Sequence, residues 1–109
     1  MENNNIEEGK KIALVSYLTI IGAIIAIYMN QEKKNSFAAF HIRQALGIFS
    51  SFFLIGYFIG YFDSWMISSA FYIFYFILWV YGFLAALQGQ MKIIPLLGEQ
   101  FQKIFKNIE

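Results

Sequence analysis

Three long stretches of the chain carry no charged residue and are rich in apolar side chains. They comprise 20 residues between Lys11 and Glu32, 19 between Arg43 and Asp63, and 28 between Asp63 and Lys92. A helix rises about 1.5 Å per residue and the hydrocarbon layer of a bilayer is about 30 Å thick, so about 20 apolar residues cross it. The pattern therefore predicts three membrane-spanning helices.

These spans make the chain a single all-α membrane domain with polar ends. The ranges that we expect are a polar tail over 1–11, spans over 12–29, 37–62 and 65–87, and an amphipathic helix over 99–108. The second range includes an interfacial start before the fully apolar part. A cleaved signal peptide is the alternative for the first span. Its apolar stretch is longer than the usual run of about 7–15 residues, however, and no small-residue cleavage site follows it.

Residues with short polar side chains precede the second and third spans. Asn35 or Ser36 stands before the second span, and Asp63 or Ser64 before the third. Such side chains accept hydrogen bonds from the free backbone N–H groups at a helix N-terminus. Because the turn over 60–64 is short, we expect the second and third spans to form an antiparallel hairpin.

A different pattern follows the third span. Pro95 interrupts a helix, because proline lacks the backbone N–H group. Beyond it, apolar residues recur at the spacing of one helix face; these are Phe101, Ile104, Phe105 and Ile108. About ten residues cannot span a bilayer. We therefore expect this helix in the lipid interface, with Phe101 and Phe105 in the apolar layer and Lys103 and Lys106 at the phosphates.

Composition supports a membrane location. Hydrophobic residues make up 59% of the 109 residues and charged residues 14%, against about 45–50% and about 25% in soluble domains. A chain this small has too much surface for its volume to hide so many apolar side chains from water. This excludes an ordinary soluble domain, a disordered chain and a nucleic-acid binder, and it makes the lipid bilayer the expected partner. With no cysteine and one histidine, we expect no metal and no cofactor, and no small-molecule substrate is identifiable.

The distribution of lysine and arginine predicts an orientation. With three spans, the tail and the 60–64 turn share one side of the membrane and carry two of these residues, whereas the opposite side carries six. Basic residues gather on the cytoplasmic side. We therefore expect the N-terminus outside and the C-terminus in the cytoplasm. If the first segment does not cross, the hairpin keeps its orientation and the tail becomes cytoplasmic.

Pairs of small residues four positions apart mark helix faces that other helices can approach closely. These pairs are Gly22 and Ala26, Gly56 and Gly60, and Gly82 and Ala86. Each face contacts either another helix of the same chain or a second copy of it.

Polar residues at the expected cytoplasmic mouth form a candidate functional cluster. Its members are His41, Arg43, Gln44, Gln88, Gly89, Gln90 and Pro95. In an antiparallel hairpin the start of one helix lies beside the end of the other, so these residues can meet. Polar groups at a membrane boundary are often functional. The alternative is that Arg43 and His41 only anchor the helix at the headgroup level.

The run Phe40-His41-x-Arg43-Gln44-Ala45-Leu46, with Ala86-x-x-Gly89 and Pro95-Leu96 beyond it, resembles a bacterial family of small membrane proteins. That family is related to the chloroplast inner-envelope protein-import component, the twenty-kilodalton Tic subunit. The resemblance covers roughly Lys10 to the C-terminus. The chain departs from the family in Ile42 and Ile94, where alanine and an aromatic residue are frequent, and in lacking the fourth span of the chloroplast proteins.

The resemblance implies a non-enzymatic, import-component-like protein of the bacterial inner membrane. It would act through helix–helix contacts with itself, as a homo-oligomer, or within a larger membrane complex, in a transport-related role. The alternative is an oligomeric small channel or transporter subunit whose mouth is ringed by Arg43 and His41. An enzyme is not expected, because His41 and Asp63 should lie about 30 Å apart across the membrane, too far for an acid–base pair.

Overall fold

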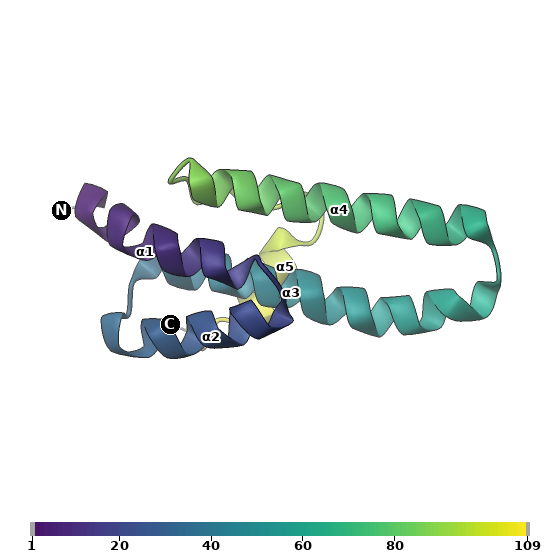
Figure 1. The fold of residues 1–109 in the computed structure, drawn as a ribbon, viewed down its shortest axis with the longest axis horizontal. Helices are drawn as coiled ribbons and strands as arrows, with labels where there is room; N and C mark the ends of the chain where they lie inside the picture. Colours follow the sequence, from purple (N-terminus) through teal and green to yellow (C-terminus); the bar gives the residue numbers. More distant parts are fainter. Residues whose placement is uncertain (1, 109) are drawn as a thin grey trace.

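The computed structural model describes residues 2–108, and the side chains of 6–108, as five α-helices and one short 3-10 helix without a strand (Figure 1). In chain order these are α1 (Glu2–Ser16), α2 (Ile20–Lys33), α3 (Ser36–Ile59), η1 (Gly60–Phe62), α4 (Trp65–Leu87) and α5 (Gly98–Ile104). The all-helical fold class is confirmed for this part of the chain.

The predicted second and third spans form the antiparallel hairpin of α3 and α4 (Figure 1). Ser36–Phe62 and Trp65–Leu87, with 27 and 23 residues, are long and apolar enough to cross a membrane. Asn35 caps α3 by accepting a hydrogen bond from the Ala38 N–H at 3.0 Å. Ser64 caps α4 in the same way. Both predicted starts are therefore confirmed, within one residue.

The predicted first span is not a single helix. Residues 12–29 are divided between the end of α1 and most of α2, with a turn at Tyr17 and Leu18. The reason lies in two hydroxyl groups that compete with the helix for backbone partners. Ser16 donates to the Ala13 carbonyl at 2.6 Å, and the extended Thr19 accepts from the Gly22 N–H at 3.1 Å to cap α2. A third spanning helix is therefore not shown.

The two short helices fold back on each other as a second hairpin. The backbone of α2 approaches α1 closely, since a Cβ on Gly22 would meet the Val15 carbonyl. At the open end of this hairpin, a Cβ on Gly9 would overlap the Asn35 side chain. Most of the range expected as a polar tail, 1–11, belongs to α1, which begins at Glu2.

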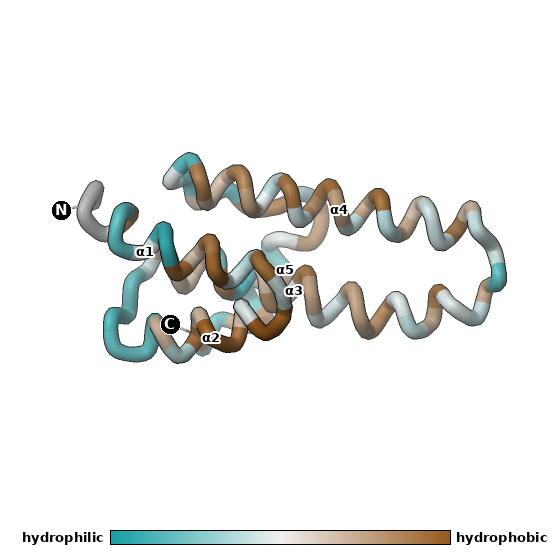
Figure 2. Tube along the Cα trace, in the orientation of Figure 1, coloured by the Kyte–Doolittle hydropathy of each residue, from teal (hydrophilic) through white to brown (hydrophobic). Residues whose placement is uncertain are grey.

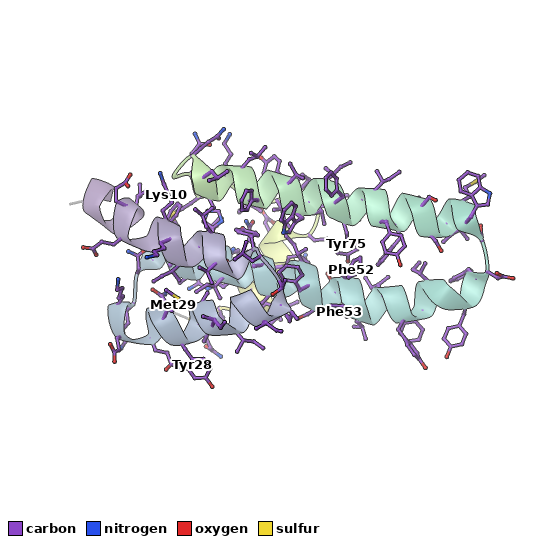
Figure 3. All side chains as sticks on the ribbon, viewed as in Figure 1. Lys10, Tyr28, Met29, Phe52, Phe53 and Tyr75 are labelled. Carbon is purple, nitrogen blue, oxygen red and sulfur yellow. The ribbon has the colours of Figure 1, made fainter. Side chains whose placement is uncertain are left out.

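Helices α1, α2 and α5 surround only the first half of α3 (Figure 1). We call this end of the molecule, around Asn30–Asn35 and Leu87–Gln90, the base, and residues 60–64 the tip. Hydrophilic residues gather at the base, and Lys10 projects there, whereas Phe52, Phe53 and Tyr75 lie just beyond the α1–α2 turn (Figures 2 and 3). The second half of the hairpin exposes its apolar side chains.

The C-terminal helix is shorter than predicted and packs on protein. It ends at Ile104 instead of continuing to 108. Phe101 is buried in the core and lies directly against Gly47 of α3. Phe105 packs against a buried apolar cluster that includes Ile42 and Leu46 of α3. Phe101 and Phe105 of the apolar face expected in lipid thus cover α3, where Gly47 leaves room for an aromatic ring, whereas Ile104 is 68% exposed. Lys103 and Lys106 are exposed.

Four of the six small residues predicted at helix contacts serve packing within the chain. Ala26 and Ala86 are fully buried, Gly22 lies against α1, and a Cβ on Gly82 would come within 2.8–3.0 Å of the Tyr17 ring. The other pair differs. Gly56 is only in ordinary contact distance of Phe71, and Gly60 faces open space.

Candidate functional site

Two residues of the predicted cluster, His41 and Gln44, lie on the same face of α3, one turn apart. Both side chains are 0% exposed. The imidazole ring of His41 is enclosed by aromatic rings, with the centroids of Phe37 at 4.8 Å and Phe40 at 5.1 Å. A polar group buried to this extent is costly unless each of its polar atoms has a partner. The partners come from two other parts of the chain.

The hydrogen bonds of His41 fix its tautomer. Nε2 lies 2.8 Å from the carbonyl oxygen of Gln90, which can only accept, so Nε2 carries the hydrogen. Nδ1 then accepts, and the Tyr17 hydroxyl donates to it at 2.7 Å. His41 therefore joins the α1–α2 turn to the segment that follows α4.

Gln44 completes the connection. Its Nε2 donates to the Tyr17 hydroxyl at 3.2 Å, and its Oε1 accepts from the Ile94 N–H at 2.8 Å. We call Tyr17, His41 and Gln44, with the Gln90 carbonyl and the Ile94 N–H, the polar network. It forms one continuous chain of donors and acceptors across three segments.

The turn that carries Tyr17 is itself held in place. The indole N–H of Trp79 in α4 donates to the Tyr17 carbonyl at 2.6 Å. Burial raises the pKa of the Tyr17 phenol well above its ordinary value, and the hydrogen bond from Gln44 opposes this shift only in part. The phenol therefore keeps its proton at neutral pH and remains a donor to His41.

Arg43 makes a separate set of contacts on another side of α3. Its Nε donates to the Ile108 carbonyl at 3.0 Å, and a terminal nitrogen donates to Oε1 of Gln102 at 3.3 Å. Gln102 in turn donates to the Phe40 carbonyl at 2.9 Å. Arg43 thus fastens the C-terminal segment to α3.

The cluster members after α4 contribute backbone rather than side chains. Gln88 and Pro95 are exposed, and Gln90 takes part only through its carbonyl group. Gly89 adopts the left-handed conformation, with φ of 71°, and a side chain there would meet Ile6. The structure thus brings His41, Gln44 and the Gln90 backbone together, and leaves Arg43, Gln88 and Pro95 outside the network.

Sequence reasoning missed several participants. Tyr17 is the central one, and Gln102 of α5 accepts from Arg43 and donates to the Phe40 carbonyl. A second buried pair lies at the base, where the Asn30 amide donates to the Asn35 carbonyl at 3.1 Å and its oxygen accepts from the Asn35 N–H at 3.0 Å. The only sequence signal for the contact between Asn30 and Asn35 is that the two asparagines stand on either side of the charged residues 32–34.

The chemistry open to the network is limited. Among the described residues, no buried side-chain polar atom lacks a hydrogen-bond partner, and no group of three acidic, histidine or cysteine residues could hold a metal. Both ring nitrogens of His41 are engaged, so the ring presents no free atom to a substrate. The arrangement is suited to holding segments in position.

Comparison with known proteins gives no match to a family model, a curated protein or a solved structure.

Proposed function

We propose that the protein is a non-enzymatic integral membrane protein of the bacterial inner membrane, anchored by the α3–α4 hairpin. It acts through contacts that its cytoplasmic base makes with a larger membrane complex, in an import-component-like, transport-related role. The observation that carries the proposal is the set of hydrogen bonds that joins the α1–α2 turn, α3, the segment after α4 and the C-terminal segment. The surface of the base is polar and exposed.

The fold-back of α1 on α2 supports an orientation that differs from the one expected with three spans. Because Gly9 lies beside Asn35, the chain enters and leaves the α1–α2 hairpin at the same end of the molecule. The side of the membrane opposite the tip then holds all the lysine and arginine residues: Lys10, Lys11, Lys33, Lys34, Arg43, Lys92, Lys103 and Lys106. Basic residues favour the cytoplasm, so both described ends of the chain are cytoplasmic.

The residues that carry the family resemblance support a role for the base. His41 and Gln44 belong to the polar network, and Arg43 holds the C-terminal segment. These contacts make Arg43 and His41 poor candidates for lining a channel mouth, since each is engaged within one chain. Gln88 and Lys92 remain exposed at the same end.

Site-specific photo-cross-linking in native membranes tests the contact role. A photoreactive residue at Gln88 or Lys92 should give adducts with a different protein, whereas one at Tyr61, which is 71% exposed near the tip, should react with lipid alone. The proposal predicts that Arg43→Ala weakens the adducts and that Lys103→Ala leaves them unchanged, because only Arg43 fastens the C-terminal segment.

Adducts at multiples of the chain's own mass would instead favour a homo-oligomeric channel or transporter subunit. No protein adduct at either base position would contradict the contact role.

A further inference from the structure

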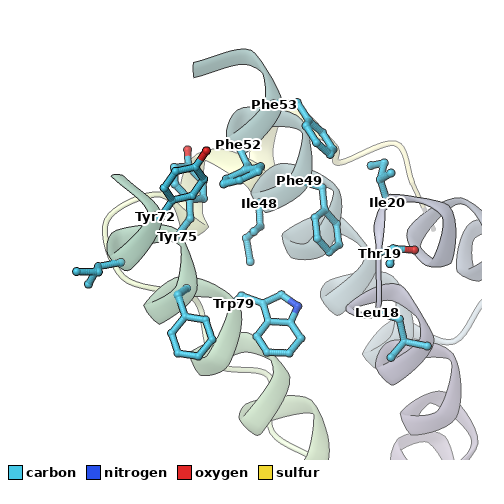
Figure 4. A pocket seen from close by; sticks show the side chains of 12 residues that line it. Leu18, Thr19, Ile20, Ile48, Phe49, Phe52, Phe53, Tyr72, Tyr75 and Trp79 are labelled. Carbon is cyan, nitrogen blue, oxygen red and sulfur yellow. The ribbon is translucent and has the colours of Figure 1, made fainter. Parts of the chain in front are cut away.

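An apolar groove lies between α3 and α4 where the α1–α2 hairpin ends. Its volume is about 710 Å³, within the range of about 300–1,000 Å³ in which pockets bury most of a small ligand. Figure 4 shows Ile48 and Phe49 of α3, Trp79 of α4 and Leu18 of the turn around it. The remaining lining residues are Thr19, Ile20, Phe52, Phe53, Tyr72, Ile73, Tyr75 and Phe76.

The groove offers almost no hydrogen-bonding group to an occupant. The Trp79 N–H is taken by the Tyr17 carbonyl, and the Tyr75 hydroxyl donates to Ser51 at 2.9 Å. The Thr19 hydroxyl caps α2. A polar ligand would lose its hydrogen bonds to water and gain none here, so the groove suits hydrocarbon.

The groove also lies at the depth of hydrocarbon. Ile48 and Phe53 lie in the uncharged stretch between Arg43 and Asp63, and Tyr72 and Trp79 lie in the one between Asp63 and Lys92. In the membrane orientation proposed above, which this inference requires, both uncharged stretches lie in the hydrocarbon layer and Arg43 lies at its cytoplasmic edge.

Two observations decide against a helix as the occupant. Helix contacts in membranes favour glycine, alanine, serine and threonine. Of the twelve lining residues only Thr19 is one of these, and its hydroxyl caps α2. The buried small residues, such as Ala26, Ala45 and Ala86, already serve contacts within the chain. A spanning helix about 10 Å wide and 30 Å long also fills about 2,400 Å³, over three times the groove volume.

We propose that this groove holds one acyl chain of a membrane phospholipid. The chain packs between the aromatic walls of α3 and α4 and against the α1–α2 turn. It thereby fills the space that neither short helix reaches.

Tryptophan fluorescence in vesicles tests this proposal directly, because the chain has two tryptophans. Trp79 lines the groove, and Trp65 is 80% exposed near the tip. The Trp65→Phe variant reports on Trp79 alone, and Trp79→Phe reports on Trp65. Both are placed in vesicles of dioleoylphosphatidylcholine mixed with its chain-brominated analogue. If Trp79→Phe fails to fold, the difference between the wild type and Trp65→Phe gives the Trp65 signal.

Bromine in the middle of the acyl chain should quench Trp79 strongly. In the Trp65→Phe background, Ile73→Phe should abolish most of that quenching, because the new ring occupies the groove. The matched control is Ile77→Phe, one turn further along α4. Ile77 is 54% exposed and Ile73 60%, but only Ile73 lines the groove.

The other outcomes overturn the proposal in distinct ways. Equal quenching in both isoleucine variants means that lipid only passes over the surface. A Trp79 that resists bromine while Trp65 is quenched means that protein, such as a second copy, covers the groove. Quenching of Trp79 by aqueous acrylamide means that water fills it. If bromine quenches neither tryptophan, the chain is not in the bilayer and the membrane proposal fails as well.

Discussion

The Tyr17 hydroxyl accepts a hydrogen bond from Gln44 and donates one to His41, so removing this single oxygen leaves two buried groups without partners. His41 and Gln44 were predicted from the sequence because polar residues stand out at the start of an apolar helix. Tyr17 was not, because it is one of seven tyrosines and lies within an apolar run. The Gln90 carbonyl and the Ile94 N–H have no signature in the sequence, since every residue carries such groups.

Tyr17→Phe should therefore destabilise the protein by about 1–3 kcal/mol, the cost of leaving buried polar groups unpaired. The measurement is the unfolding free energy from titration with a denaturing detergent in mixed micelles. Tyr57→Phe is the control, because the Tyr57 hydroxyl bonds only the exposed Tyr61. An equal loss in both variants would show that the polar network contributes nothing specific.

The helices show which patterns determine structure by themselves. The bounds of α3 and α4 were predicted nearly to the residue, because a long apolar run that follows a polar capping residue fits few structures other than a spanning helix. The α1–α2 turn was not, since it contains neither glycine nor proline and its only signals are the hydroxyls of Ser16 and Thr19. The face of α5 was predicted but its partner was not, because an apolar helical face fits lipid and protein equally well.

Glycine substitution tests the contact between α4 and the α1–α2 turn. A Cβ at Gly82 would press on the Tyr17 ring, which its hydrogen bonds prevent from moving aside. Gly82→Ala should therefore cost about 1–3 kcal/mol of unfolding free energy, as overpacking does. Gly60→Ala, with nothing near its Cβ, should leave stability nearly unchanged in the same detergent titration. A larger loss of stability in Gly60→Ala than in Gly82→Ala would contradict the close contact between α4 and the α1–α2 turn.

The whole molecule separates its charges along its length. Asp63 at the tip is the only charged residue between Arg43 and Lys92. Sequence reasoning derived the orientation of the hairpin from this distribution. It expected the N-terminal tail on the opposite side because it treated 12–29 as one span, and the contact between Gly9 and Asn35 that argues otherwise joins residues distant in sequence.

Labelling of single cysteines tests the orientation, since the chain has no native cysteine. A membrane-impermeant maleimide should label Asp63→Cys in spheroplasts. It should label Glu8→Cys and Gln100→Cys only in inverted vesicles. All three residues are exposed. Labelling of Glu8→Cys from outside would instead restore the three-span topology.

The short tip, with its single carboxylate, also limits how much of the described chain would have to cross the membrane. In the orientation proposed above, only the few residues around Asp63 and Ser64 would pass through the hydrocarbon layer, and placing one aspartate there costs about 2.5–3.5 kcal/mol on insertion scales. Two apolar helices entering together repay such a sum many times over. In that orientation the two helices can enter the bilayer as a pair, and the basic residues of the described chain stay on the side where they are synthesised.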